Sequence, residues 1–192
     1  MTKPDKAALR AELRAARDGF ILNLAPGERA RRESRAAAYL APWIDGASCV
    51  AFYHAIGSEL DCGAAITAAV ARGITVALPH VEDRDSAMRF LAWTPGNPLE
   101  TGWRGLIQPR VDAPEVEPDI IVAPLLGFDS ALARLGQGAG FYDRAFAALP
   151  DVKKFGLCWS IQQRPVIACD PWDVPLDAVV TEAGVIEGSG TG

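Results

Sequence analysis

The sequence predicts an α/β fold: one layered α/β/α domain over 1–185, with a mostly parallel central sheet and a flexible tail at 186–192. Short apolar, β-rich runs alternate with helical segments, which is typical of strands joined by crossover helices. The run "DIIVAPLL" (119–126) is continuous and β-branched, as expected for a strand covered on both faces. The 192 residues and 49% hydrophobic content suit one core, with two domains as the weaker alternative.

Two extra helices are expected at the N-terminus, over 3–24 and about 28–40. In the first, apolar residues recur at spacings of three and four, which places them on one helical face. The segment "APGE" separates the two helices because proline and glycine interrupt a helix. The apolar positions of the first helix are Leu9, Leu13, Ala16, Phe20 and Leu24.

The central sheet is expected to start with a strand–helix–strand unit at 48–54, 62–73 and 74–79. The predicted helix after the strand at 119–126 covers about 142–149, and the segment 94–118 is rich in proline and glycine and is expected to be a loop. The remaining predicted strands are 88–93, 154–160 and 176–182, the last two closing the sheet.

Charge and cysteine content narrow the possible functions. A net charge of −5 argues against a broad nucleic-acid surface, although it leaves room for a local basic pocket. No apolar run is long enough to span a membrane. The cysteines lack zinc-site spacing, and we expect buried thiols in a reducing cytoplasm. They are Cys49, Cys62, Cys158 and Cys169.

The segment "RLGQGAGFYDRAF" (134–146) is the best candidate for a ligand site. Glycines at 136, 138 and 140 can bring backbone N–H groups close to an anion. The helix expected to start near Phe141 or Tyr142 adds free N–H donors, and Arg134 adds a guanidinium. A plain flexible loop is the alternative. The spacing fits neither the dinucleotide fingerprint nor a Walker-type P-loop.

Asp143 follows the glycines directly. A carboxylate beside bound phosphates is repelled unless a cation intervenes, and Mg²⁺ takes one or two carboxylates together with phosphate oxygens. The alternative is that Asp143 only stabilises the N-terminus of the helix.

Several segments, in order, resemble the 5-formyltetrahydrofolate cyclo-ligase family. "APLLGFDSALARLGQGAGFYDRAF" is similar to the family's glycine signature, and "KAALRAELRAAR" resembles its basic N-terminal helix. "GSELDCGAAI" and "DVPLDAVVTE" are similar to two further family segments. The resemblance extends from about Lys6 to Glu182. It implies a fold like that of sugar-phosphate isomerases and CoA transferases.

The resemblance also implies an activity. Members of the family use ATP and Mg²⁺ to cyclise 5-formyltetrahydrofolate to 5,10-methenyltetrahydrofolate through a phosphorylated formyl group. The expected partner is therefore a small folate, with or without a polyglutamate tail. We expect the protein to be a cytoplasmic monomer that binds neither nucleic acid nor a membrane. Catalysis then rests mainly on positioning and charge stabilisation.

The resemblance assigns nucleotide contacts to two cations of the first helix, Lys6 and Arg10, although a solvated helix face is the alternative. It assigns Asp143 and Asp173 to Mg²⁺, and catalytic roles to Arg134 and Tyr142. The implied nucleotide segment consists of Arg134, Gly136, Gln137, Gly138, Ala139, Gly140, Phe141 and Tyr142.

The resemblance implies that Glu59 contacts the folate, and a carboxylate suits the donor edge of a 2-amino-4-oxo ring. His54 and Trp103 occupy neighbouring family positions, although a structural role is the alternative for both. Gly138 and Phe141 are implied to face the substrate as well. The Glu59 segment, the glycine segment and "WSIQQRP" each follow a predicted strand, so we expect them at the ligand-binding edge of the sheet.

The sequence departs from the family pattern at Ala133, Ala139, Phe141 and Trp172. Phe141 replaces a tyrosine, which removes one hydroxyl. Two other hypotheses remain: an isomerase or transferase that needs no ATP, and a non-catalytic nucleotide- or folate-binding regulator. Fold alone does not choose among them.

Overall fold

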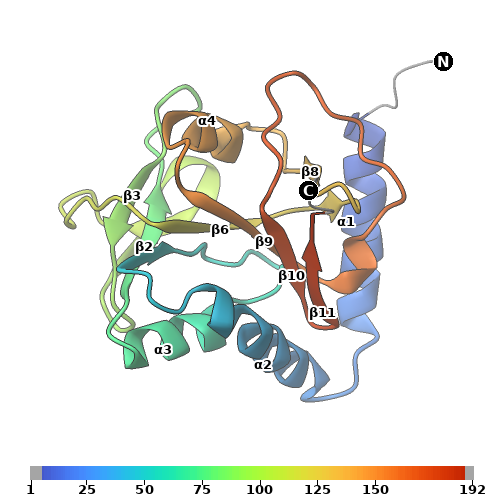
Figure 1. The fold of residues 1–192 in the computed structure, drawn as a ribbon, viewed down its shortest axis with the longest axis horizontal. Coiled ribbons are helices and arrows are strands. Elements are labelled where there is room, and N and C mark those ends of the chain that lie inside the picture. The colour runs from blue at the N-terminus through green and yellow to red at the C-terminus, as the bar shows by residue number, and fades with distance from the viewer. Residues whose placement is uncertain (1–5, 189–192) are drawn as a thin grey trace.

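The computed structural model describes residues 6–188, which form helical layers on both faces of a seven-stranded sheet (Figure 1). The strand order is β11-β10-β9-β6-β1-β2-β3. The five central strands run parallel, and β11 and β3 pair antiparallel at the edges. The mostly parallel sheet confirms the predicted fold class. The strands are β1 (Cys49–Ala51), β2 (Thr75–His80), β3 (Arg89–Ala92), β6 (Ile120–Pro124), β9 (Lys153–Leu157), β10 (Ala178–Thr181) and β11 (Gly184–Glu187).

Helices α2 and α3 cover one face of the sheet, α4 covers the other, and α1 stands beside the β11 end (Figure 1). No helix within residues 6–188 has the length and apolar character needed to cross a bilayer. The bounds are α1 (Lys6–Leu22), α2 (Glu28–Leu40), α3 (Gly63–Ala71) and α4 (Phe141–Ala148).

Alternation along the central strands fills a core on each face. In β1, Val50 points to the α2/α3 side and Ala51 to the α4 side, and both are fully buried. In strand β6, Val122 points to the α2/α3 side and Ile121 points to the α4 side. Both cores are apolar, and this explains why residues 120–126 carry no polar side chain.

The segment expected to be a loop at 94–118 contains a hairpin, so that prediction was wrong. Strands β4 (Leu99–Thr101) and β5 (Ile107–Pro109) pair antiparallel around a turn in which Arg104 has φ 51°. The buried Gln108 side chain accepts a hydrogen bond from the Val81 amide, which attaches the hairpin to the sheet.

Two other expectations need correction at the C-terminal end. Strand β11 closes the sheet and continues to Glu187, so the first residues of the predicted tail at 186–192 belong to a strand. Residues 189–192 lie outside the described range, as do residues 3–5 of the first predicted helix. Cys169 is exposed, whereas the other three cysteines are buried as expected.

Strand order brings the candidate segments together. After β1 the chain proceeds to β2 on one side and later to β6 on the other, so the order reverses between β1 and β6. Crevices at the carboxyl ends of such strands are where open α/β sheets bind ligands. Glu59 follows β1, and the glycine segment follows β6.

Candidate active site

Side-chain hydrogen bonds join the three segments that follow β1, β6 and β9. The indole of Trp159 donates to the carbonyl of Ser58 at 2.9 Å. The buried amide of Gln162 donates to the carbonyl of Leu125 at 2.6 Å. The expected meeting of these segments at one sheet edge is therefore found in the structure.

The glycine segment forms a bare backbone turn between a short hairpin and α4. The hairpin consists of β7 (Gly127–Phe128) and β8 (Arg134–Leu135). Gly138 has φ 103° and Gly140 has φ 73°, a region in which a side chain is strained. Helix α4 starts at Phe141, within the predicted range. We call residues 136–140 the glycine loop.

One cavity, of about 340 Å³, lies between the glycine loop and helix α1, and we call it the outer cavity. Arg10 lines it and donates from Nε to the carbonyl of Gly136 at 2.9 Å. Lys6 Nζ lies 2.7 Å from Asp170 Oδ2 and 2.7 Å from Asp173 Oδ2. The outer cavity therefore combines backbone amides, two cations of α1 and carboxylates.

The Lys6 ammonium is held in its charged form. Partial burial alone would lower its pKa, but hydrogen bonds and charges from Asp170 and Asp173 outweigh burial and raise the pKa above 10.5. Lys6 thus remains a cation at any physiological pH. It can attract phosphate oxygens or neutralise the two aspartates, depending on what occupies the cavity.

Arg134 and Asp143 form an ion pair in the wall of the outer cavity, with Nη2 and Oδ1 2.6 Å apart. Arg134 is 7% exposed, and its guanidinium also lies over the Tyr142 and Phe146 rings at 5.8 and 5.6 Å. Its Nε has no hydrogen-bond partner among the described residues. A buried donor left unpaired is costly, so it is available to a ligand oxygen.

The donor set of the outer cavity fits Mg²⁺ bound together with phosphates. Within residues 6–188, no group of three or more His, Cys, Asp or Glu side chains is arranged to hold a metal alone. Asp143, Asp170 and Asp173 nevertheless line one cavity with the glycine loop. Mg²⁺ usually takes one or two carboxylates, with water and substrate phosphates completing the octahedron. The carboxylates now pair with cations, which such an ion would replace.

A second cavity, of about 200 Å³, lies on the other side of the glycine loop, and we call it the inner cavity. His54, Glu59 and Trp103 all line it. The Trp103 ring meets the edge of the Phe141 ring at 5.4 Å and 85°. Gly138 and Arg134 line both cavities, so the loop is a shared wall.

Tyr142 lines the inner cavity as a neutral phenol. Burial raises its pKa, and the nearby charge of Glu59 raises it further, against a smaller opposing effect of Arg134. A neutral hydroxyl can donate a hydrogen bond to a ligand in this cavity.

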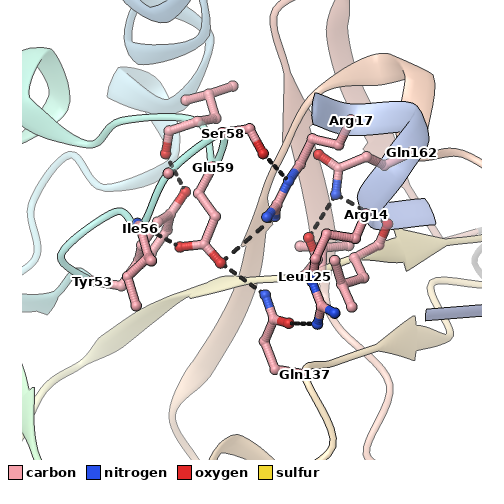
Figure 2. Close-up of polar contacts among 12 residues, drawn as sticks. Arg14, Arg17, Tyr53, Ile56, Ser58, Glu59, Leu125, Gln137 and Gln162 are labelled. Atoms are coloured by element: carbon pink, nitrogen blue, oxygen red, sulfur yellow. Dashed lines mark hydrogen bonds and ion pairs between the residues drawn. The ribbon is translucent and has the colours of Figure 1, made fainter. Parts of the chain in front are cut away.

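Glu59, like Asp143, is an acidic residue that lines the inner cavity, and its polar contacts are drawn in Figure 2. It is 5% exposed. Its Oε2 accepts from the Ile56 amide at 3.0 Å, and its Oε1 accepts from Gln137 Nε2 at 3.0 Å. Arg17 Nη1 lies 3.6 Å from the same Oε1. Gln137 Oε1 in turn accepts from Arg14 Nη2 at 2.7 Å, so the glycine loop connects α1 to Glu59.

The sequence interpretation missed Arg14, Arg17 and Asp170. The signal for the arginines was present, because Lys6, Arg10, Arg14 and Arg17 follow one another at helical spacings of four, four and three. All four contact the glycine loop or the segments facing it. No local pattern distinguishes Asp170 from other turn aspartates.

Comparisons with known proteins identify the family to which this chain is similar. Residues 2–182 match the profile of the "5-formyltetrahydrofolate cyclo-ligase family". The 5-formyltetrahydrofolate cyclo-ligase of Escherichia coli K12 is 31% identical over 156 residues, covering 76% of this chain and 84% of the relative. The cyclo-ligase of Mycolicibacterium smegmatis is 30% identical over 178 residues, covering 86% and 91%.

Two solved structures share the fold. The NMR structure of Aquifex aeolicus 5,10-methenyltetrahydrofolate synthetase has a TM-score of 0.79 and 29% identity, covering 97% of this chain and 94% of that one. The Mycoplasma pneumoniae synthetase has a TM-score of 0.72 and 24% identity, covering 93% and 99%, and supports the fold alone. From the profile match and the curated relatives together, the chain belongs to the 5-formyltetrahydrofolate cyclo-ligase family of enzymes.

Proposed function

We propose that this chain cyclises 5-formyltetrahydrofolate to 5,10-methenyltetrahydrofolate, with ATP and Mg²⁺. The observation that carries the proposal is the pair of cavities sharing one glycine wall. The outer cavity offers amides, Lys6 and Arg10 to a triphosphate. The inner cavity offers Glu59 and aromatic rings to a pterin. Reacting groups bound on the two sides meet at Gly138.

The proposed reaction has two steps, phosphorylation of the formyl oxygen and then closure of the ring. The formyl oxygen attacks the γ-phosphorus, and ADP leaves. N10 then attacks the formyl carbon and loses its proton, and the C–O bond breaks to release phosphate. Phosphorylation is needed because an amide oxygen is a poor leaving group. Mg²⁺, when bound at Asp143 and Asp173, would neutralise charge on the phosphates.

The chain's own residues position the two reactants. The buried Arg134 faces both cavities and is suited to the charge of the transferring phosphoryl group. Tyr142 donates a hydrogen bond on the substrate side. The Phe141 and Trp103 rings limit the space available to the folate and exclude water. Phe141 lacks the hydroxyl of the usual tyrosine, so its role is purely steric.

We also propose a cytoplasmic monomer acting on folates of any glutamate number. Three of the four free thiols are buried, which suits a reducing compartment. Arg14, Arg84 and Arg104 line a groove that continues from the inner cavity, and their charges suit the carboxylates of a tail. Gel filtration tests the monomer, and KM values for mono- and polyglutamates test the groove.

The deciding assay is turnover of 5-formyltetrahydrofolate, followed by absorbance of the methenyl product. We expect product only with ATP and Mg²⁺ both present. Product formed without nucleotide favours an isomerase- or transferase-like enzyme. Binding of ATP and folate without product favours a regulator.

A further inference from the structure

Arg17 differs from the other cations of α1 because its side chain is buried on the packed face of the helix. It is 4% exposed and lies one turn after Leu13, which is 1% exposed. An arginine at such a position is rare unless a partner compensates for the lost hydration. The residues that Arg17 contacts therefore show which groups compensate for the lost hydration of its charge.

Two contacts fix the guanidinium (Figure 2). Nε donates to Ser58 Oγ at 2.9 Å, and Ser58 Oγ in turn donates to Asp18 Oδ1. Nη1 lies 3.6 Å from Glu59 Oε1, which is within ion-pair range but too long for a hydrogen bond. Within the described part of the chain, Nη1 has no hydrogen-bond partner.

Glu59 is the carboxylate that lies within ion-pair range of the Arg17 guanidinium. Glu59 lines the inner cavity, whereas Arg17 lines only the neighbouring groove and is almost fully buried there. Arg17 donates a hydrogen bond to Ser58, which is the residue next to Glu59. The position of the guanidinium is therefore linked to the position of the Glu59 carboxylate. A second donor, Gln137, approaches the same oxygen from the glycine loop at 3.0 Å. Glu59 Oε1 thus has one partner on a helix and one on a loop, while Oε2 accepts from the Ile56 amide.

We propose that Arg17 is the positioning residue of Glu59: it keeps the carboxylate aimed at the donor edge of the pterin, without touching the substrate. This inference rests on the proposed function. It predicts that Arg17 contributes to affinity for the folate through Glu59 alone, and contributes nothing to affinity for ATP or to the chemical step.

A double-mutant cycle tests this. KM for 5-formyltetrahydrofolate, KM for ATP and kcat are measured for the wild type, Arg17→Met, Glu59→Gln and the double variant. Calorimetry with 5-formyltetrahydrofolate, without nucleotide, gives the affinity independently of turnover. We expect Arg17→Met to weaken folate affinity about tenfold to a hundredfold, as truncation of a buried charge pair does. In the Glu59→Gln background, the same change should alter affinity less than about twofold.

Two further variants provide controls. Arg17→Lys keeps the charge but not the planar guanidinium, and should recover a large part of the folate affinity. Arg31→Met removes an exposed arginine that pairs with Glu28 on another helix, and should leave folate affinity within about twofold. Should Arg17→Met fail to fold because it leaves Glu59 buried and unpaired, comparing Glu59→Gln with the double variant still applies, since that pair lacks the charge conflict.

The outcomes are separable. A wild type that neither binds nor turns over 5-formyltetrahydrofolate refutes the proposed function itself. An active wild type whose folded Arg17→Met variant keeps its folate KM refutes the positioning role alone. An Arg17→Met effect that persists in the Glu59→Gln background also refutes it, because Arg17 would then contact the substrate directly from the neighbouring groove.

Discussion

The charged groups on the two sides of the glycine loop are built differently. On the inner side, Arg17 and Glu59 have side chains only 5% and 6% exposed. On the outer side, Lys6, Asp170 and Asp173 have side chains 14% to 18% exposed. The inner carboxylate is also held by the Ile56 amide and by Gln137, whereas the outer cluster joins the start of α1 to a loop in which the Asp170 amide donates to Asp173 Oδ2.

This difference matches the chemistry proposed for each side. A neutral pterin ring needs a carboxylate already oriented and dehydrated, because the ring brings no charge to reorganise it. A triphosphate with Mg²⁺ brings both signs of charge and can exchange partners with Lys6 and the aspartates. We therefore expect a preformed inner side and an outer side that completes its contacts when the ligand arrives. The following variants test that contrast, from the largest expected effect to the smallest.

Asp143→Asn should reduce turnover by about a hundredfold or more and flatten its dependence on Mg²⁺, since metal-ion charge stabilisation contributes several kcal/mol. The rate of methenyl product formation, titrated with Mg²⁺, measures this. Asp151→Asn, an exposed aspartate just beyond α4, is the matched control. A rate like that of the wild type would exclude Asp143 from the metal site.

Glu59→Gln should raise the folate KM about tenfold to a hundredfold, because it replaces a charged acceptor by an amide. The KM for ATP should stay within about twofold if the two sides act separately. Steady-state kinetics with each substrate varied gives both numbers. Glu12→Gln, on the exposed face of α1, is the control. A larger rise in the KM for ATP would place Glu59 on the wrong side of the loop.

Gly138→Val should raise the KM for ATP and lower the free energy of unfolding by about 1–3 kcal/mol, because φ 103° is strained for valine. The added side chain also begins 3.4 Å from Arg10 Cζ and so narrows the outer cavity. Gly96→Val has similar strain at φ 98° but open space around it. Both variants should lose stability, and only the first should lose ATP affinity. Equal KM values would reject the loop as a phosphate site.

Lys6→Met should have the smallest effect of the four variants. It should lower the free energy of unfolding by an amount that depends on pH. The folded-state pKa of Lys6 is raised above 10.5, so the charge contributes stability below pH 10.5 and loses it as pH rises through the folded value. Urea unfolding at pH 7, 9 and 11 should give a constant difference between variant and wild type at the first two, and a smaller one at the third. A difference that grows with pH would contradict the ion pairs with Asp170 and Asp173.

Local patterns predicted most of the fold. The strand at β6 and the start of α4 depend on nearby residues, and both were found within a few positions. Strand β11 and the β4–β5 hairpin were missed because they contain glycine and polar residues and are stabilised by pairing with distant segments. Edge strands lack the continuous apolar run that marks a central one.

Residue chemistry alone indicated Asp143 after the glycines, whereas Lys6 and Arg10 were indicated by the family resemblance and not by their spacing. All three line the outer cavity. Helical spacing relates Arg17 to Lys6 and Arg10, but it does not predict that Arg17 is buried, because its burial depends on Ser58 and Glu59 arriving from another segment. The pairing of Arg134 with Asp143 was likewise invisible, since it depends on how tightly the loop turns.

A crystal structure with Mg²⁺ and a non-hydrolysable ATP analogue tests the central claim most directly. We expect a triphosphate on the amides of residues 136–140, between Arg10 and Arg134, with Mg²⁺ on Asp143 and Lys6 moved from Asp173 to a phosphate. A triphosphate bound away from the glycine loop, or an outer cavity left empty at saturating nucleotide, would contradict it.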